Sequence, residues 1–490
     1  MKTIANHHHI LFAVSAMLLI SQPAKPQTGQ PYIHDPSTIM ECNGKYYTFG
    51  TGGGGLISED GWNWKSGAVR PGGGAAPDAI KIGDRYLIAY GNSGGGLNGG
   101  HNAHIFTMWN QSLDPASPDF KFTEPVEVAA SDGLEDNDAI DPGLLLDPTT
   151  GKLWLSYGTY FGNIRLVELD AKTGQRVQGN KPVDIGIDCE ATDLIYRDGW
   201  YYLLGTHGTC CDGVNSTYNI VVGRSQKVTG PYKDNVGRTM TEGGGRMVIS
   251  AGGRLVGPGH FGREVIDEGV EVMSCHYEAD MDRSGRSVLG IHPLLWKNGW
   301  PSAGESFKEG TYAITSERRG YALELAVDFV RMQQKQQAFW RIDPHEPVVS
   351  LADQQLQDVM QTWPKDNIRV RIGDYMMRPH QLWTITAVPE AGGYLGGPYY
   401  KIIISGTSRA LAATQDAEVT TVAEYTGAPE QLWRIEQLTD GTYRIMPKVI
   451  PGKPGLNTHF VLYSIGDSTP TLAAYDFGSD NSKWNFKMKP

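Results

Sequence analysis

Residues 194–204 read LIYRDGWYYLL, and this stretch decides the fold of the chain. Two runs of aromatic and aliphatic residues flank the pair Asp198-Gly199, and such a pair between strand-like runs favours a two-residue β-turn. The stretch therefore predicts a tight β-hairpin. The same arrangement recurs in residues 40–49, MECNGKYYTF, and in residues 144–157, LLLDPTTGKLWLSY.

Similar hairpins fill the sequence from residue 30 to about residue 303. Units of about 50 to 55 residues give five repeats over this region. Five repeated sheets separated by Gly-rich and Asn-rich turns indicate an all-β fold. We expect a five-bladed β-propeller with four strands per blade around a central channel. A β-sandwich or a β-helix is the alternative architecture.

The pattern changes near residues 300–304, and a second repeat begins. Tryptophans 43, 50 and 51 residues apart end the motifs QAFW (337–340), QLW (381–383), QLW (431–433) and SKW (482–484). Tyr-x-Ile runs start at Tyr312, Tyr400 and Tyr443. An internal repeat of this size predicts symmetric units, and we expect the tryptophans to lie in the core.

The Gln-x-Trp pattern resembles that of ricin-type β-trefoil lectin domains, which commonly bind carbohydrate. A trefoil has three repeats, whereas this sequence has four Trp motifs. We assign the Tyr312 run to Trp340. The unit between Trp340 and Trp383 lacks a clear Tyr-x-Ile run, and we interpret it as an insertion.

The N-terminus has the pattern of a signal peptide. Lys2 is followed by an apolar run from Ile10 to Ile20 and then by polar residues. This run is shorter than the roughly 18 to 20 residues that cross a bilayer, so we expect no membrane insertion. The predicted parts are residues 1–27 as signal peptide, 28–305 as propeller and 306–490 as trefoil. We expect a periplasmic or extracellular protein.

Charge and cysteine content narrow the function further. The net charge of −11 argues against nucleic acid as a partner, because phosphate binding needs clustered Lys and Arg. A polysaccharide or oligosaccharide fits better. The five cysteines are too few for a disulfide scaffold. Cys210 and Cys211 adjoin each other and could pair elsewhere, whereas we expect Cys42, Cys189 and Cys275 to be buried free thiols.

Three acids stand at the starts of hairpins: Asp35, Asp141 and Glu190. Inner strands of a propeller line one channel, so acids from different blades can meet there. An Asp before Pro is commonly a turn residue, but a pair of carboxyl groups in different environments can hydrolyse a glycosidic bond. Asp35 suits the general base, Glu190 the general acid, and Asp141 a residue that orients the acid and modulates its pKa.

Four ordered segments carry a specific resemblance. They are residues 34–52, 139–164, 190–225 and 274–301, which resemble successive signatures of glycoside hydrolase family 43, closest to its arabinanases. The resemblance implies a five-bladed propeller that hydrolyses α-L-arabinofuranosyl linkages with inversion. It places Asp35 at the family's general base, Glu190 at its general acid and Asp141 at its pKa modulator.

The resemblance also suggests further contacts. His276 matches a histidine near a channel metal, usually calcium, although a buried His is commonly a core residue and calcium prefers oxygen ligands. Phe161 is a candidate sugar-stacking platform. No organic cofactor is expected. Ala75 stands where arabinanases often have Trp, and Asp138 where they often have Asn.

These departures leave the substrate open. One alternative is an exo-acting arabinofuranosidase, galactofuranosidase or β-xylosidase. An alternative of another class is a non-catalytic carbohydrate-binding protein, which the presence of all three acids disfavours.

Overall fold

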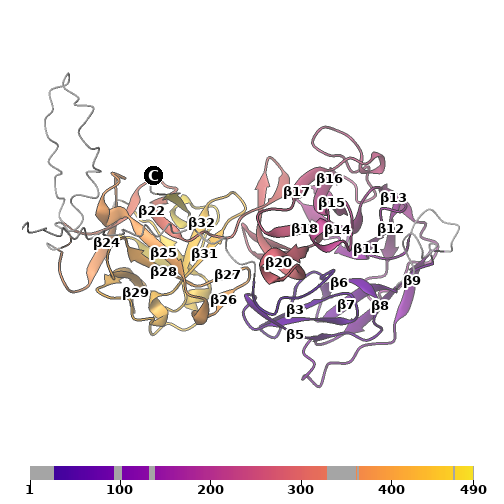
Figure 1. Cartoon of the computed structure of the whole chain (residues 1–490), viewed down its shortest axis with the longest axis horizontal. Helices are drawn as coiled ribbons and strands as arrows, with labels where there is room; N and C mark the ends of the chain where they lie inside the picture. Colours follow the sequence, from indigo (N-terminus) through magenta and orange to yellow (C-terminus); the bar gives the residue numbers. More distant parts are fainter. Residues whose placement is uncertain are drawn as a thin grey trace, which may run out of the picture.

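The computed structural model describes residues 27–92, 102–131, 138–327, 360, 363–466 and 469–488. These residues are mainly strands, arranged in two β-rich bodies (Figure 1). None of the described residues forms a helix with the length and hydropathy needed to cross a membrane. The predicted signal peptide lies almost wholly outside the described residues. Its last residue, Gln27, is buried and accepts a hydrogen bond from Trp64, so the folded domain begins no later than Gln27.

The first body is a propeller of five sheets. Blade 1 contains β1 (Thr28–Gly29), β2 (Met40–Cys42), β3 (Lys45–Phe49), β4 (Gly54–Ser58) and β5 (Asn63–Val69). Blade 2 contains β6 (Ala75–Ile82), β7 (Arg85–Asn92), β8 (His104–Asn110) and β9 (Val126–Ala130). Blade 3 contains β10 (Gly143–Leu146), β11 (Leu153–Tyr157), β12 (Ile164–Leu169) and β13 (Val183–Gly186).

The remaining two blades complete the ring. Blade 4 contains β14 (Glu190–Arg197), β15 (Trp200–His207), β16 (Asn219–Ser225) and β17 (Arg246–Ile249). Blade 5 contains β18 (Leu255–Asp267), β19 (Val270–Asp280), β20 (Arg286–Lys297) and β21 (Trp300–Ala303). The predicted five-bladed propeller is therefore confirmed, although the blades are less even in length than a repeat of about 50 residues implies.

The predicted turns form for the expected reason. Asn43 and Gly44 join β2 to β3 with φ of 53° and 78°, and Asp198 and Gly199 join β14 to β15 with φ of 49° and 83°. Two successive left-handed residues match the twist of a two-residue hairpin, and Asn-Gly and Asp-Gly tolerate them best. These turns fix the register of each inner strand against its neighbour.

The inner strands β2, β6, β10, β14 and β18 surround the channel. A cavity of about 260 Å³ is lined by residues of all five, including Met40, Ala79, Leu145, Ile195 and Arg263. The start of the chain closes the ring against blade 5. The backbone N–H of Leu289 donates to the Pro31 carbonyl (2.8 Å), and the Ser287 hydroxyl donates to the Ile33 carbonyl (2.7 Å).

The second body contains three repeats of four strands. The first has β22 (Gly310–Ser316), β23 (Ala322–Leu325), β24 (Ile368–Gly373) and β25 (Trp383–Ala387). The second has β28 (Tyr400–Ile404), β29 (Ala410–Ala413), β30 (Val419–Val422) and β31 (Trp433–Gln437). The third has β32 (Tyr443–Pro447), β33 (Phe460–Tyr463), β34 (Thr471–Ala474) and β35 (Trp484–Met488). A short hairpin, β26 (Gly393–Tyr394) and β27 (Gly397–Pro398), follows the first repeat.

Short 3-10 turns connect the strands. They are η1 (Gly213–Asn215), η2 (Met240–Glu242), η3 (Met281–Arg283), η4 (Pro379–Gln381), η5 (Pro389–Ala391), η6 (Pro429–Gln431), η7 (Leu456–Thr458) and η8 (Asp480–Ser482). The turns η4, η6 and η8 each stand two residues before the Trp that opens the last strand of a repeat. The Gln of each Gln-x-Trp motif therefore ends a turn.

The tryptophans of the three repeats are core residues, as predicted. Trp383, Trp433 and Trp484 have no exposed surface. Their ring N–H groups donate to backbone carbonyls at equivalent positions, Leu323 (2.9 Å), Leu411 (3.0 Å) and Leu462 (2.8 Å). Burial of each ring together with a satisfied N–H explains why Trp recurs at these positions.

One assignment within the trefoil was wrong. Tyr312 lies opposite Trp383 in the sheet, just as Tyr400 lies opposite Trp433 and Tyr443 opposite Trp484. The Tyr312 run therefore belongs to the repeat of Trp383 and not to Trp340. The motif at residues 337–340 lies outside the described residues, in the segment between β23 and β24.

The trefoil packs against turns of blades 1 and 5. Gly393 donates its N–H to Asp60 beside the β4–β5 turn (2.9 Å). Thr439 donates to the Gly269 carbonyl in the β18–β19 turn (2.9 Å). The buried Arg444 forms an ion pair with Asp267 (2.8 Å). These contacts join the two bodies at one end of the propeller strands.

Candidate active site

The three predicted acids gather at the other end of the inner strands. Asp35 precedes β2, Asp141 precedes β10, and Glu190 is the first residue of β14. Asp35 and Asp141 have left-handed backbones with φ of 51° and 54°. Non-glycine residues rarely adopt this conformation, and it is concentrated at functional sites. His260 of β18 shares it, with φ of 63°.

Hydrogen bonds surround the carboxylate of Asp35. Oδ2 lies 2.9 Å from His34 Nδ1 and accepts a hydrogen bond of 2.6 Å from the Thr51 hydroxyl, while Oδ1 lies 3.6 Å from His260 Nδ1. Burial alone would raise the pKa of Asp35, but the neighbouring imidazoles of His260 and His34 hold it well below its usual value. Asp35 is therefore an ionised carboxylate across the ordinary pH range.

His34 links this carboxylate to a second one. Its Nε2 lies 2.9 Å from Glu278 Oε1, and its ring stacks on that of His276 with centroids 4.4 Å apart. Burial lowers the pKa of His34, but the hydrogen bonds to Asp35 and Glu278 raise it to about 10. His34 is thus an imidazolium that donates to a carboxylate from each nitrogen.

Glu190 has the opposite protonation state at mildly acidic pH. Its side chain is buried, and the hydroxyl of Tyr218 donates to Oε1. Burial raises the pKa of Glu190 to about 7, the charges of Asp35 and Glu278 add to the rise, and the Tyr218 hydrogen bond opposes it. A carboxyl group with this pKa can donate a proton near neutral pH.

Asp141 is held beside Glu190. Its Oδ2 accepts a hydrogen bond from the backbone N–H of Ala191 (3.2 Å), the residue after Glu190. Burial and the charges of Glu190 and Asp35 raise the pKa of Asp141 well above its usual value. The two groups therefore influence each other's protonation.

Phe161 lies at the edge of this site. It is half-buried in the loop between β11 and β12, with its ring centroid 4.4 Å from that of Tyr160. Burial and the charges of Glu190 and Asp141 raise the pKa of Tyr160. Tyr160, which the sequence did not single out, therefore lies close enough to the acids for their charges to affect it.

The surroundings of His276 bear on the predicted calcium. Atoms of His34, Asp35 and His276 that could bind a metal lie within 4.8 Å of one another. Both ring nitrogens of His276 are already in hydrogen bonds, because Nδ1 accepts from the Asp35 N–H (3.1 Å) and Nε2 lies 3.2 Å from Glu278. This arrangement does not fit direct coordination of a metal by His276, and we assign no step to a metal.

Sequence reasoning missed several partners of the acids. They are His34, His260, Tyr218 and Glu278. His34 and Tyr218 lie in segments that carry the resemblance, and the proximity of His34 to Asp35 was a usable signal. Glu278 also lies in such a segment, two residues after His276, whereas nothing near His260 in the sequence indicated that blade 5 turns it toward Asp35.

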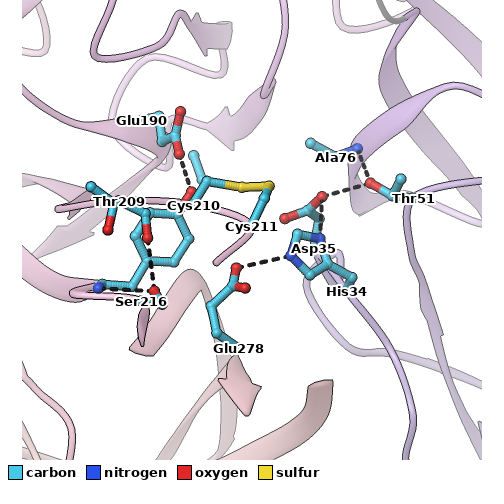
Figure 2. The surroundings of a disulfide bond; sticks show 12 residues. His34, Asp35, Thr51, Ala76, Glu190, Thr209, Cys210, Cys211, Ser216 and Glu278 are labelled. Carbon is cyan, nitrogen blue, oxygen red and sulfur yellow. Dashed lines mark hydrogen bonds and ion pairs between the residues drawn. A yellow bond between two sulfur atoms is a disulfide. The ribbon is translucent and has the colours of Figure 1, made fainter. Parts of the chain in front are cut away.

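Of the five cysteines, only Cys210 and Cys211 lie at the channel mouth that holds the acids (Figure 2). Cys210 and Cys211 form a disulfide with each other, a pairing that the sequence left open. The loop between β15 and β16 brings their sulfur atoms to the channel mouth (Figure 2). Cys42, Cys189 and Cys275 are buried free thiols, as predicted.

An open groove extends from the site along the seam of blades 1 and 5. It encloses about 560 Å³ and is lined by residues that include Tyr32, His34, Thr51, Ser66 and Arg286. Residues from the first and last blades therefore shape one approach to Asp35.

A five-bladed propeller that gathers an ionised carboxylate and a carboxyl group of raised pKa at one channel mouth has the architecture of a glycoside hydrolase. The chain belongs to glycosyl hydrolases family 43, whose family model matches residues 47–301. A second model, ricin-type beta-trefoil lectin domain-like, matches residues 379–449. The family resemblance and the fold class drawn from the sequence are confirmed.

Curated relatives cover mainly the propeller. An extracellular exo-alpha-(1->5)-L-arabinofuranosidase of Cellvibrio japonicus is 31% identical over 334 residues, which are 61% of this chain and 93% of the relative. An extracellular endo-alpha-(1->5)-L-arabinanase of Bacillus subtilis is 37% identical over 179 residues, which are 36% of this chain and 54% of the relative. The chain thus spans about half the length of the Bacillus protein and nearly all of the Cellvibrio protein.

Solved structures give the same picture. An exo-1,5-alpha-L-arabinanase from a bovine ruminal metagenomic library has a TM-score of 0.52 and 30% identity, covering 58% of this chain and 99% of that structure. An alpha-L-arabinanase of Cellvibrio cellulosa complexed with arabinohexaose has a TM-score of 0.51 and 27% identity, covering 56% of this chain and 95% of that structure.

Proposed function

We propose that the chain is an exported hydrolase of α-L-arabinofuranosyl linkages in arabinan-type polysaccharides and that it acts with inversion. The observation that carries this proposal is the contrast between Asp35, held ionised by two imidazoles, and Glu190, whose burial raises its pKa to about 7. The names of the relatives supply the substrate class.

In the proposed reaction the Glu190 carboxyl donates its proton to the glycosidic oxygen as the bond to the anomeric carbon breaks. The Asp35 carboxylate takes a proton from a water molecule that attacks the same carbon from the opposite face. Each turnover leaves Glu190 ionised and Asp35 protonated, and proton exchange with solvent restores both. The imidazolium of His34 keeps Asp35 ionised, and Asp141 holds the backbone N–H of Ala191 next to Glu190.

The stereochemistry tests this mechanism directly. Proton NMR of early products should show the β-anomer released from an α-linked substrate. The corresponding prediction for the bound state is that the two catalytic carboxyl groups lie roughly 6.5 to 9.5 Å apart, with room for the water molecule. Release of the α-anomer would instead indicate a covalent intermediate and overturn the assignment of Asp35 as base.

The mode of attack on the chain has two candidates, because the relatives include both an endo-acting and an exo-acting enzyme. Digestion of debranched arabinan separates them. A ladder of oligomers supports endo action, whereas arabinose or a single short product supports exo action. Aryl galactofuranosides and xylosides test the wider alternatives, and no hydrolysis of any of these substrates would favour a binding protein without catalysis.

We propose that the trefoil holds the enzyme on its substrate. It packs on the β4–β5 and β18–β19 turns, whereas the acids lie at the opposite end of the propeller strands. In β19, Val270 at the trefoil end and His276 near the acids are six residues apart, which is roughly 20 Å of strand. The trefoil therefore lies away from the cleavage point and would grip a separate stretch of polysaccharide.

Retention on insoluble arabinan tests this role. Glu190→Gln in the full chain should bind the polymer without cleaving it, and part of this binding should persist when arabinotriose saturates the channel. Complete release by arabinotriose would show that only the channel binds. The extracellular relatives support export. Calcium remains a prediction, tested by titration of the chelated protein with the metal.

A further inference from the structure

The disulfide between Cys210 and Cys211 borders the space between the proposed acid and base. In the view of Figure 2 it lies between Glu190 on one side and the Asp35–His34 pair on the other. A ring nitrogen of His34 and the Sγ atoms of both cysteines lie within 4.8 Å of one another. Cys211 is exposed and Cys210 half-buried. The sulfur atoms therefore face the channel mouth rather than the protein core.

The loop that carries the disulfide is firmly held. The Thr209 backbone N–H and hydroxyl lie 3.1 Å from the Thr217 hydroxyl, and the Ser216 hydroxyl donates to the Thr209 carbonyl (2.8 Å). Tyr218, which follows Thr217 in the sequence, donates a hydrogen bond from its hydroxyl to the proposed acid Glu190. The disulfide is thus fixed relative to the acid by a short run of hydrogen-bonded chain.

The disulfide is chemically unlike its surroundings. A bond between adjacent cysteines closes a small ring of sulfur and carbon atoms whose side chains offer no N–H or O–H donor, whereas the nearby groups are carboxyls, imidazoles and hydroxyls. A furanose has polar edges and a face of C–H groups. Among the described residues of blade 2, the first two of β6 are the small Ala75 and Ala76.

We propose that the Cys210–Cys211 disulfide is part of the sugar-binding surface and that its sulfur atoms pack on the C–H face of the sugar at the cleavage point. It increases affinity for the substrate and takes no part in proton transfer. This inference rests on the proposed function. Its ligand class is a neutral pentofuranosyl residue of an oligosaccharide.

Reduction of the full-length enzyme tests the proposal. One molecule of dithiothreitol transfers two electrons and two protons, so that the S–S bond becomes two thiols and the reagent closes to a cyclic disulfide. All five cysteines lie in the described residues, and the other three are free, so this bond is the target. We expect KM for arabinotriose to rise about tenfold, the effect of losing roughly 50 Å² of apolar contact, with much less change in kcat.

Two variants serve as controls. Cys210→Ala with Cys211→Ala should show the raised KM without reductant and no response to dithiothreitol. Cys42→Ser removes a buried free thiol elsewhere and should respond like the wild type. An unchanged KM in both the reduced enzyme and the double variant would overturn the proposal. If the double variant fails to fold, the reduced and reoxidised wild type decides.

Arabinotriose binding to the Glu190→Gln variant tests the sugar contact of the disulfide separately from the proposed hydrolytic function. Calorimetry should give an arabinotriose dissociation constant about tenfold weaker once Cys210 and Cys211 are also replaced by Ala. Equal affinity with and without the disulfide contradicts the sugar contact alone. No binding of arabinotriose to Glu190→Gln, with no hydrolysis of arabinan by the wild type, contradicts the substrate class. A fall in kcat at constant KM would assign the disulfide a structural role and also overturn the contact.

Discussion

At the scale of single residues, the site depends on opposed surroundings for similar groups. Asp35 is the proposed base because two imidazoles stabilise its charge, and Glu190 is the proposed acid because burial destabilises its charge. Glu190→Gln and Asp35→Asn should each lower kcat by about 10²- to 10⁴-fold, the usual contribution of a general acid or base. Steady-state assays on arabinan measure the loss, with circular dichroism to verify folding. Wild-type activity in either variant would contradict the assignment.

The pKa of Glu190 predicts how activity depends on pH. Glu190 works in its protonated form, so activity should be present below pH 7 and fall as the pH rises through about 7, the pKa of Glu190. The Tyr218 hydrogen bond lowers this pKa. Tyr218→Phe should therefore move the alkaline limb of kcat/KM to higher pH, while Tyr232→Phe, at a buried tyrosine that bonds Val228, should leave it in place. A shift to lower pH would contradict the role of Tyr218.

The acidic limb reports on His34. Loss of its hydrogen bond and positive charge should raise the pKa of Asp35, which must be ionised to act as base. His34→Gln should therefore move the acidic limb of kcat/KM to higher pH. His292→Gln is a matched control, because His292 is a half-buried histidine that bonds Tyr277 and not Asp35. An unmoved limb in His34→Gln would show that His260 alone sets the pKa.

At the scale of elements, most of the fold could be predicted from local sequence. Hairpins were predictable because Asn-Gly and Asp-Gly specify both the turn and the register within about ten residues. The acids were predictable because each stands beside such a hairpin. The partners from blade 5 were not, since His260 reaches Asp35, and Glu278 reaches its neighbour His34, only through closure of the ring. The repeat of Trp383 was misread because the long segment after β23 separates its first and last strands.

If the three trefoil repeats are equivalent, their core tryptophans should contribute similarly to stability. Trp383→Ala, Trp433→Ala and Trp484→Ala each remove a fully buried ring and one hydrogen bond, so each should lower the free energy of unfolding by about 3 to 5 kcal/mol. Urea unfolding of the three variants measures this. Trp363→Ala, a partly exposed position in the same domain, should cost clearly less. Markedly unequal losses would contradict equivalent repeats.

At the scale of the whole molecule, the two domains meet through a few close contacts. A methyl group on Gly269 would stand 2.1 Å from the Phe477 ring, and the glycine also has φ of 69°. Gly269→Ala should therefore loosen the trefoil from the propeller and divide thermal unfolding into two transitions. Gly253→Ala is the matched control, since Gly253 has φ of 60° and open space around it. A single transition in both variants would contradict this role of the interface.

The closure of the propeller has a consequence for synthesis. Asp35 lies among the first folded residues, while His260, His276 and Glu278, which touch it or its neighbour His34, are more than 220 residues later. A growing chain that lacks blade 5 has the proposed base but none of these partners. Catalytic competence should therefore arise late, when the first and last blades meet, and a nascent or truncated polypeptide should be inert toward glycans inside the cell that makes it.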